Sequence, residues 1–331
     1  MSDPRVHRTE ATKAGRLDAV LAHQVPLSRS RLKALIQEGR ITVNGELERS
    51  PRRKVWAGDV LVVHEPPPPP SGLRAQDLDV PLLHIDDSCV VVDKPADMVV
   101  HPAKGHPDGT LVNGLLHLIT EARHEEGPYP TPPGRPGIVH RLDRGTSGVL
   151  VVARTPAALT HLAAQFAAHT VDRAYAALVW GATPGPSGTI DAPLARHPAD
   201  RMRYSVQERG KRAVTHWSRI AEARYGVAGD ARGGALSLVQ CRLETGRTHQ
   251  IRVHMHSIGL PLVGDPLYGR RKPIPSSLRE ALGPIDRQLL HAGRLGFEHP
   301  VQAERLKFLR PPAADFRRVL LELKLPVPFL V

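Results

Sequence analysis

One stretch of sequence decides the fold expected of this chain: Gly137-Ile-Val-His-Arg-Leu-Asp143-Arg-Gly-Thr-Ser-Gly148. A single acid, Asp143, lies between an apolar first half and a turn-forming run of glycine, threonine and serine, and a second apolar run, 149–152, follows at once. The pattern predicts strand, turn and strand, with Asp143 at the end of the first strand. Rigid scaffolds often present a reactive group on such a loop, although an Asp in a turn commonly bonds only its own backbone.

Residues 140–148 resemble the signature of the RluA-type pseudouridine synthases, whose Asp at the position of Asp143 is the catalytic nucleophile. Members of this family isomerise uridine to pseudouridine in RNA. Further stretches resemble the other family motifs in the same order, so the resemblance covers most of residues 80–325. These stretches are residues 93–102, 101–110, 173–179, 244–254, 264–269 and 287–291.

The resemblance also implies the substrate. It is strongest to members that act on large-subunit ribosomal RNA, which makes that RNA, or its precursor particle, the expected partner. Related members with the same motifs act elsewhere in ribosomal or transfer RNA. The chain departs from the family at Asp93, where Asn is usual, at Arg144, where Lys is usual, and at Gly145, where a polar or acidic residue is common.

The resemblance assigns three catalytic residues. Asp143 is the nucleophile, Arg252 is its ion-pair partner with Arg247 as the second choice, and Tyr175 stacks on the target uracil and can assist proton removal from carbon 5. A carboxylate nucleophile splits one difficult step into two easier ones. It must stay ionised in a partly closed pocket, which burial opposes and an adjacent arginine favours. From the residues alone, Tyr175 also fits a core position and either arginine fits a structural ion pair.

Arginines beside the nucleophile are expected to contact the RNA. By the resemblance, Arg141 fills the gap that an extruded base leaves in the RNA stack, and Arg144 contacts a phosphate, as Arg247 can. The whole chain supports a polyanionic partner, because its net charge is +12 and its pI is about 10.2. Only 4% of the residues are aromatic, so a broad base-stacking platform is not expected.

Composition predicts four segments. Residues 1–12 are polar and expected to be flexible, 13–64 resemble an alpha-L RNA-binding domain, 65–79 form a proline-rich linker, and 80–331 form the catalytic domain. Residues 1–64 hold 12 Lys or Arg against 7 Asp or Glu, and their basic side chains fit either a solvated face or RNA contact. The residues expected on the RNA side are Arg29, Arg31, Lys33 and Arg40.

The catalytic segment is predicted to be α+β. Apolar strand-like runs and helix-like runs mix without a regular alternation of strand and helix, which favours a mixed, mainly antiparallel sheet. A cap residue and proline, Thr155-Pro156, begin one predicted helix, and another is expected over 248–257, ended by Gly259. In the first domain, Ile41-Thr-Val-Asn-Gly45 is typical of a hairpin.

Other functional classes fit less well. Neither the cysteines, Cys89 and Cys241, nor the histidines, His249, His254 and His256, have metal-ligand spacing, so no metal is expected, and no glycine-rich loop calls for a nucleotide cofactor. Two cysteines fit a reducing compartment, and no apolar run is long enough for a membrane. We expect a cytoplasmic monomer. The alternatives are a non-catalytic RNA-binding or ribosome-assembly factor and, last, a histidine-based metal hydrolase.

Overall fold

The computed structural model describes residues 5–27, 29–66, 73–103, 105–123, 137–225, 234–269 and 283–330. The chain divides into two compact units, Met1–Ser71 and Gly72–Val331. Most of the predicted proline run lies outside the described residues, as do residues 1–4. Within the described residues, no helix is both long and apolar enough to cross a membrane.

The first unit packs two short helices on a four-stranded antiparallel sheet of order β1-β6-β3-β4. Its core joins the predicted helical residues, such as Leu21 and Leu32, to Ile41 and Leu61 of the sheet. The predicted hairpin is confirmed, because Asn44 and Gly45 both have positive φ (53° and 86°) between β3 and β4, as a tight primed turn requires. The elements are β1 (Arg5–Glu10), β2 (Gly15–Arg16), α1 (Leu17–Gln24), α2 (Arg29–Gln37), β3 (Ile41–Val43), β4 (Glu46–Glu48), β5 (Lys54–Val55) and β6 (Val60–Glu65).

The expectation of a flexible N-terminal segment is wrong for Arg5–Glu10. These residues form β1, which pairs with β6 from Arg5 opposite Glu65 to Glu10 opposite Val60. A hydrogen bond between the imidazole of His7 and the carboxylate of Glu65 (3.1 Å) joins the two strands. A polar, charged sequence is compatible with an edge strand, because its neighbour supplies the backbone partners while the charges prevent further pairing.

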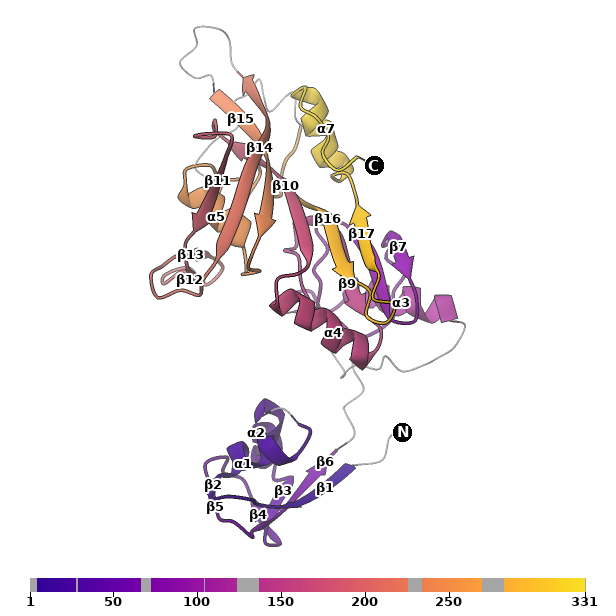
Figure 1. Cartoon of the computed structure of the whole chain (residues 1–331), viewed down its shortest axis with the longest axis vertical. Helices are drawn as coiled ribbons and strands as arrows, with labels where there is room; N and C mark the ends of the chain where they lie inside the picture. The colour runs from indigo at the N-terminus through magenta and orange to yellow at the C-terminus, as the bar shows by residue number, and fades with distance from the viewer. Residues whose placement is uncertain are drawn as a thin grey trace. The chain divides into compact units, whose positions relative to one another are not determined.

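The second unit is built on one nine-stranded sheet of order β11-β14-β15-β10-β16-β9-β8-β7, with β17 also paired to β16 (Figure 1). Strands β9 and β16 are parallel, and the other described pairings are antiparallel, so the predicted α+β class with a mixed, mainly antiparallel sheet is confirmed. Its elements are β7 (Leu82–Ile85), β8 (Cys89–Lys94), α3 (Leu111–Arg123), β9 (Ser147–Ala153), α4 (Pro156–Ala167), β10 (Asp172–Trp180), β11 (Ser187–Asp191), β12 (Leu194–Arg196), β13 (Tyr204–Val206), β14 (Val214–Tyr225), β15 (Gly234–Leu243), α5 (Gln250–Ser257), β16 (Leu290–Glu298), β17 (Arg305–Leu309) and α7 (Ala314–Glu322).

Both faces of this sheet are covered, which explains why its central strands are apolar throughout. On β10, Ala177 and Val179 pack in one cluster with α3 and α5, whereas Leu178 and Trp180 pack in another with α7. Helix α4 covers the second face over β8 and β9. Successive residues of one strand point to opposite faces. Tyr175, two residues before Ala177, therefore lies on the same face as α3 and α5.

Local signals set the helix ends. Thr155 caps α4 by accepting the N–H of Ala158 (3.1 Å), with Pro156 as the first helical residue, as predicted. Helix α5 ends at Ser257, and Gly259 follows with φ 80°, a left-handed conformation that glycine adopts without strain. The predicted helix over 248–257 is confirmed, although it begins two residues later, at Gln250.

A buried lysine joins the end of β8 to the turn before β9. Lys94 is fully buried and its ammonium donates to the carbonyls of Pro95 (2.7 Å), Met98 (2.8 Å) and Arg144 (3.2 Å). Burial, together with the nearby Arg287 cation, lowers the pKa of Lys94 to about 7. Three accepting carbonyls replace only part of the hydration that the charged group loses on burial.

We expect the substitution Lys94→Met to remove a pH dependence of stability. The pKa of Lys94 is about 7 in the folded protein against 10.5 for an ordinary lysine, so unfolding takes up a proton between these values. The contribution of Lys94 to the free energy of unfolding is therefore greatest above pH 10.5 and is lost as the pH falls towards about 7. The free energy of unfolding of the wild type, relative to Lys94→Met, rises above pH 7 by up to about 1.4 kcal/mol per pH unit. Urea unfolding at several pH values measures this, and a constant difference contradicts it.

Candidate active site

A pocket of about 920 Å³ lies beside the turn that carries Asp143. Its wall includes Asp143 from that turn, Tyr175 from β10 and Arg252 from α5. Pockets of this size are typical of small-molecule and cofactor sites. The structure therefore brings together the three residues for which catalytic roles were predicted, although they lie far apart in the sequence.

Asp143 does not end a strand, so this part of the sequence-based prediction is wrong. Ile138 makes only an isolated bridge to Val152, and Asp143 lies in the turn before β9. A histidine side chain takes the place of a strand beside this part of β9. The backbone N–H of Val151 donates to the imidazole Nε2 of His140 (3.1 Å) and not to a backbone carbonyl of the segment before Asp143. Burial lowers the pKa of His140 to about 3, so Nε2 remains an acceptor.

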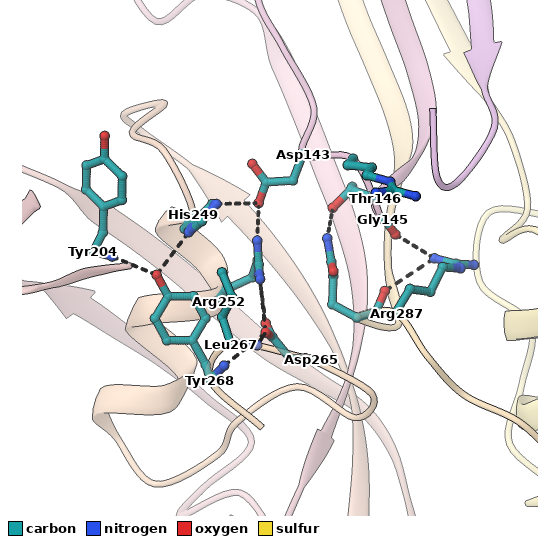
Figure 2. Close-up of polar contacts among 12 residues, drawn as sticks. Asp143, Gly145, Thr146, Tyr204, His249, Arg252, Asp265, Leu267, Tyr268 and Arg287 are labelled. Atoms are coloured by element: carbon teal, nitrogen blue, oxygen red, sulfur yellow. Dashed lines mark hydrogen bonds and ion pairs between the residues drawn. The ribbon is translucent and has the colours of Figure 1, made fainter. Parts of the chain in front are cut away.

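Arg252 joins two carboxylates (Figure 2). Its Nη1 donates to Asp143 Oδ2 (2.9 Å), while Nε and Nη2 donate to the two oxygens of Asp265 (2.7 and 3.0 Å). Only 4% of the side chain is exposed. Burial opposes its charge, but the bonds to Asp265 and Asp143 outweigh this and raise the pKa of Arg252 above its ordinary range. The guanidinium is thus a fixed cation beside Asp143.

Asp265 holds the other side of Arg252, and we did not assign it a role from the sequence. Its side chain is fully buried, and its Oδ1 also accepts the N–H groups of Leu267 (2.9 Å) and Tyr268 (3.0 Å). Burial would raise the pKa of Asp265, but the bonds from Arg252 and these N–H groups lower it. The dipeptide Asp265-Pro266 was the signal in the sequence that could have indicated these backbone hydrogen bonds, because an Asp before proline commonly bonds the backbone of its own turn.

His249 completes the group around Asp143. Its Nε2 lies 4.0 Å from Asp143 Oδ2, and its Nδ1 is hydrogen-bonded to the hydroxyl of Tyr268 (2.9 Å). That hydroxyl also accepts the backbone N–H of Tyr204 (2.8 Å), as Figure 2 shows. The sequence assigned no catalytic role to His249, because its position next to Asp143 depends on the tertiary fold.

The turn that carries Asp143 is held by donors from two other segments. The N–H of Thr146 donates to the carbonyl of Asp143 (3.0 Å), and Gln288 donates to the Thr146 hydroxyl (3.1 Å). Arg287, paired with a carboxylate of α7, donates to the carbonyl of Gly145 (2.9 Å). A Cβ at Gly145 would lie 2.7 Å from Gln288 Oε1, so glycine allows this close packing.

The remaining predicted site residues of this unit lie at or near the pocket. Tyr175 is buried, and burial raises the pKa of its hydroxyl. Arg141 and Arg247 are exposed and line the pocket. Arg144 is also exposed, but it does not line the pocket; its Nε donates to the carbonyl of Asp97 (3.2 Å).

The basic residues predicted in the first unit lie on or beside α2. Arg29 is exposed and donates to the buried carboxylate of Asp18 (3.2 Å), which also binds Arg16. Lys33 and Arg40 are exposed, and Arg31 is half-buried.

One group of possible metal ligands lies elsewhere among the described residues: His84, Asp86 and Cys89. Asp86 already accepts N–H groups of its own turn and of His299, whose other ring nitrogen accepts backbone N–H groups. Burial, together with the Asp86 charge, raises the pKa of Cys89 to about 12, which disfavours the thiolate that a metal needs. This arrangement fits a hydrogen-bonded turn between β7 and β8.

Comparison with known families accounts for most of the chain. Residues 88–257 match the model of the RNA pseudouridylate synthases, and residues 15–61 match the model of the S4 domain. The first match contains Asp143, Tyr175 and Arg252, and the second contains α1 and α2.

Individual relatives agree with this assignment. The chain is 45% identical to "Ribosomal large subunit pseudouridine synthase D" of Zymomonas mobilis, over 93% of each chain. It is 43% identical to the protein of that name from Pseudomonas aeruginosa, over 91% of this chain and 89% of the other. Among solved structures, human RNA pseudouridylate synthase domain containing 1 is similar, with 27% identity, a TM-score of 0.52, and 72% of this chain and 85% of that chain covered. The chain belongs to the RNA pseudouridylate synthase family and is an RNA pseudouridine synthase with an S4 domain.

Proposed function

We propose that this RNA pseudouridine synthase modifies specific uridines of large-subunit ribosomal RNA, or of its precursor particle, with Asp143 as nucleophile. Two relatives that match over most of the chain are named for the large ribosomal subunit. The observation that supports the chemistry best is the ion pair between Asp143 and Arg252 in the wall of the pocket.

The reaction sets clear demands on the site. The bond between C1′ of the ribose and N1 of uracil must break, the base must turn, and a bond between C1′ and C5 must form. The hydrogen on C5 is then lost and N1 gains one, so the product is an isomer of the substrate. A carboxylate that bonds transiently to the sugar or the base can divide this exchange into easier steps.

The two oxygens of the Asp143 carboxylate have different surroundings, which suits the proposed role as nucleophile. Its Oδ2 accepts the bond from Arg252, whereas Oδ1 has no hydrogen-bond partner among the described residues. The Arg252 cation stabilises the Asp143 carboxylate before it attacks the substrate and again after its bond to the substrate breaks. One oxygen is thus fixed in place while the other can reach the substrate.

Tyr175 and Arg141 would serve the extruded nucleotide. Taking a base out of its stack costs a few kcal/mol, less in a loop. We propose that the ring of Tyr175, in the pocket wall, stacks on the target uracil, and that its hydroxyl can assist proton removal from C5. The exposed Arg141 at the same pocket would occupy the gap in the RNA, with Arg144 and Arg247 contacting phosphates.

The first unit would add affinity for RNA. We propose that residues 13–64 are the RNA-binding domain, 65–79 the linker and 80–331 the catalytic domain. The S4 family match, the surplus of basic residues over 1–64, and the exposure of Arg29, Lys33 and Arg40 support this role.

Pseudouridine mapping tests substrate and nucleophile together. In cells that lack the gene, we expect specific pseudouridines to be missing from large-subunit ribosomal RNA. The wild-type gene should restore them and Asp143→Asn should not, with turnover at least about 10³-fold lower because the neutral amide is not a nucleophile. Asp79→Asn is the matched control, since Asp79 is exposed and has φ 45°, which Asn also tolerates. Pseudouridines missing only from other RNA contradict the substrate, and an active Asp143→Asn contradicts the nucleophile.

Arg252→Lys tests the bridging guanidinium. Lysine keeps the positive charge but cannot donate to Asp143 and Asp265 in the same fixed geometry. We expect the single-turnover rate to fall about 100-fold, with the affinity for RNA unchanged. An unchanged rate would mean that positive charge alone is sufficient at this position.

Removal of residues 1–64 tests the RNA-binding unit. Because binding of a phosphate releases counterions, the plot of log affinity against log salt should become shallower by about 0.7 for each phosphate that the shortened protein no longer binds. Replacing Arg29, Lys33 and Arg40 by Gln should give part of this change. Replacing the exposed Arg5 and Arg8 of β1 by Gln is the control and should give less. An unchanged salt dependence after removal of residues 1–64 excludes the proposed role.

A further inference from the structure

We propose that His249 is a further catalytic residue, whose Nε2–H donates a hydrogen bond to a carbonyl oxygen of the target uracil and stabilises the negative charge that the base acquires when its glycosidic bond breaks. The proposal deepens the proposed function and rests on Asp143 as the nucleophile.

The position of His249 fits a donor to the substrate. Its side chain lines the pocket and is 16% exposed, and its Nε2 lies 4.0 Å from Asp143 Oδ2. That separation is too long for a hydrogen bond. Among the described residues, Nε2 has no closer polar partner. The Nε2–H of His249 is therefore available to donate to a carbonyl oxygen of a base that lies against Asp143.

The tautomer of His249 is set by Tyr268. The Tyr268 hydroxyl oxygen accepts the N–H of Tyr204, and its own hydrogen has one acceptor among the described residues, Nδ1 of His249. Burial raises the pKa of Tyr268, so this hydroxyl keeps its hydrogen. With Nδ1 occupied as an acceptor, the neutral imidazole must carry its hydrogen on Nε2.

The surroundings also keep His249 neutral. Burial lowers the pKa of His249, and the Arg252 and Arg141 cations act in the same direction, against Asp143 and Asp265. The residue is therefore suited to donate a hydrogen bond without transferring a proton. This distinguishes it from a general acid, which must be protonated before it acts.

A strained backbone and two neighbouring rings hold the imidazole of His249 in place. His249 has φ 58° and ψ 19°, in the left-handed region, immediately before α5. Such a conformation is strained for a residue other than glycine and is concentrated at functional sites. The rings of Tyr204 and Tyr268 contact the imidazole edge to face, at centroid distances of 5.7 and 5.8 Å.

The chemistry explains what this donor stabilises. When the bond between C1′ and N1 breaks, its electron pair stays with uracil and the charge spreads over N1 and the two carbonyl oxygens. A donor aimed at one of these oxygens is more valuable at that moment than in the starting complex. Formation of the bond between C5 and C1′ uses this electron pair and makes the base neutral. Loss of the C5 proton and gain of a proton at N1 then give the product without a net change in charge. His249 itself gains and loses no proton.

Two substitutions of His249 test the donor. Asn tolerates the left-handed backbone, but its amide reaches only as far as Nδ1, whereas the amide of Gln reaches the position of Nε2. We expect His249→Asn to lower the single-turnover rate about 100-fold and His249→Gln to recover at least tenfold of that loss. Affinity for RNA should stay the same in both. His256→Asn is the matched control, since the ring of His256, on α5, is also near that of Tyr268 (5.9 Å between centroids) but does not line the pocket.

The substrate for this test is total RNA from cells that lack the gene, so the result does not depend on the choice of RNA. A wild type without activity there contradicts the proposed function. A wild type with activity, together with Asn and Gln variants that are equally fast or equally slow, overturns only the role of His249.

Nitrogen-15 NMR of labelled histidine gives a readout independent of activity. In the wild type, His249 should carry its hydrogen on Nε2, and Tyr268→Phe should allow the Nδ1–H form to appear. A wild type in the Nδ1–H form overturns the proposal whatever the rates of the variants.

Discussion

The buried guanidinium of Arg252 is the constraint on which the catalytic unit depends. It lies between two carboxylates, and buried charges are tolerated only when they are paired and fully hydrogen-bonded. Asp265 meets this condition with two guanidinium N–H groups and two backbone N–H groups, whereas Asp143 gives Arg252 a single oxygen. The same cation thus holds both oxygens of Asp265 but only one oxygen of Asp143.

The turn that carries Asp143 is fixed by a different principle. Lys94, Arg287 and Gln288 come from β8 and from the segment before β16, and they donate to backbone carbonyls and to a threonine hydroxyl. None of these bonds goes to the carboxylate of Asp143. These bonds therefore fix the turn without using the carboxylate of Asp143, which is the preorganisation that its proposed role as nucleophile requires.

The sequence was informative where local chemistry governs structure. Thr155-Pro156 began α4, and Asn44-Gly45 formed the hairpin, because these residues act through their own backbone. Asp143, Tyr175 and Arg252 could be placed in one site only through the family resemblance. The contact of Asp265 with Arg252 and that of His249 with Tyr268 could not be predicted, since each depends on partners brought together by the tertiary fold. Strand β1 was missed because β6 supplies its partners, and the segment before Asp143 was mistaken for a strand because a histidine side chain replaces a backbone acceptor.

The pairing of Arg287 with Asp315 of α7 has a consequence for synthesis of the protein. The arginine that supports the carbonyl of Gly145 is itself held by the last helix (2.6 Å), and β9 needs β16, well over 100 residues later in the chain, as its parallel partner. A nascent chain whose residues 290–322 are still inside the ribosome exit tunnel lacks both. The turn that carries Asp143 is therefore fully supported only once β16 and α7 have folded, and a protein truncated before α7 has Asp143, Tyr175 and Arg252 but lacks the contact between Asp315 and Arg287.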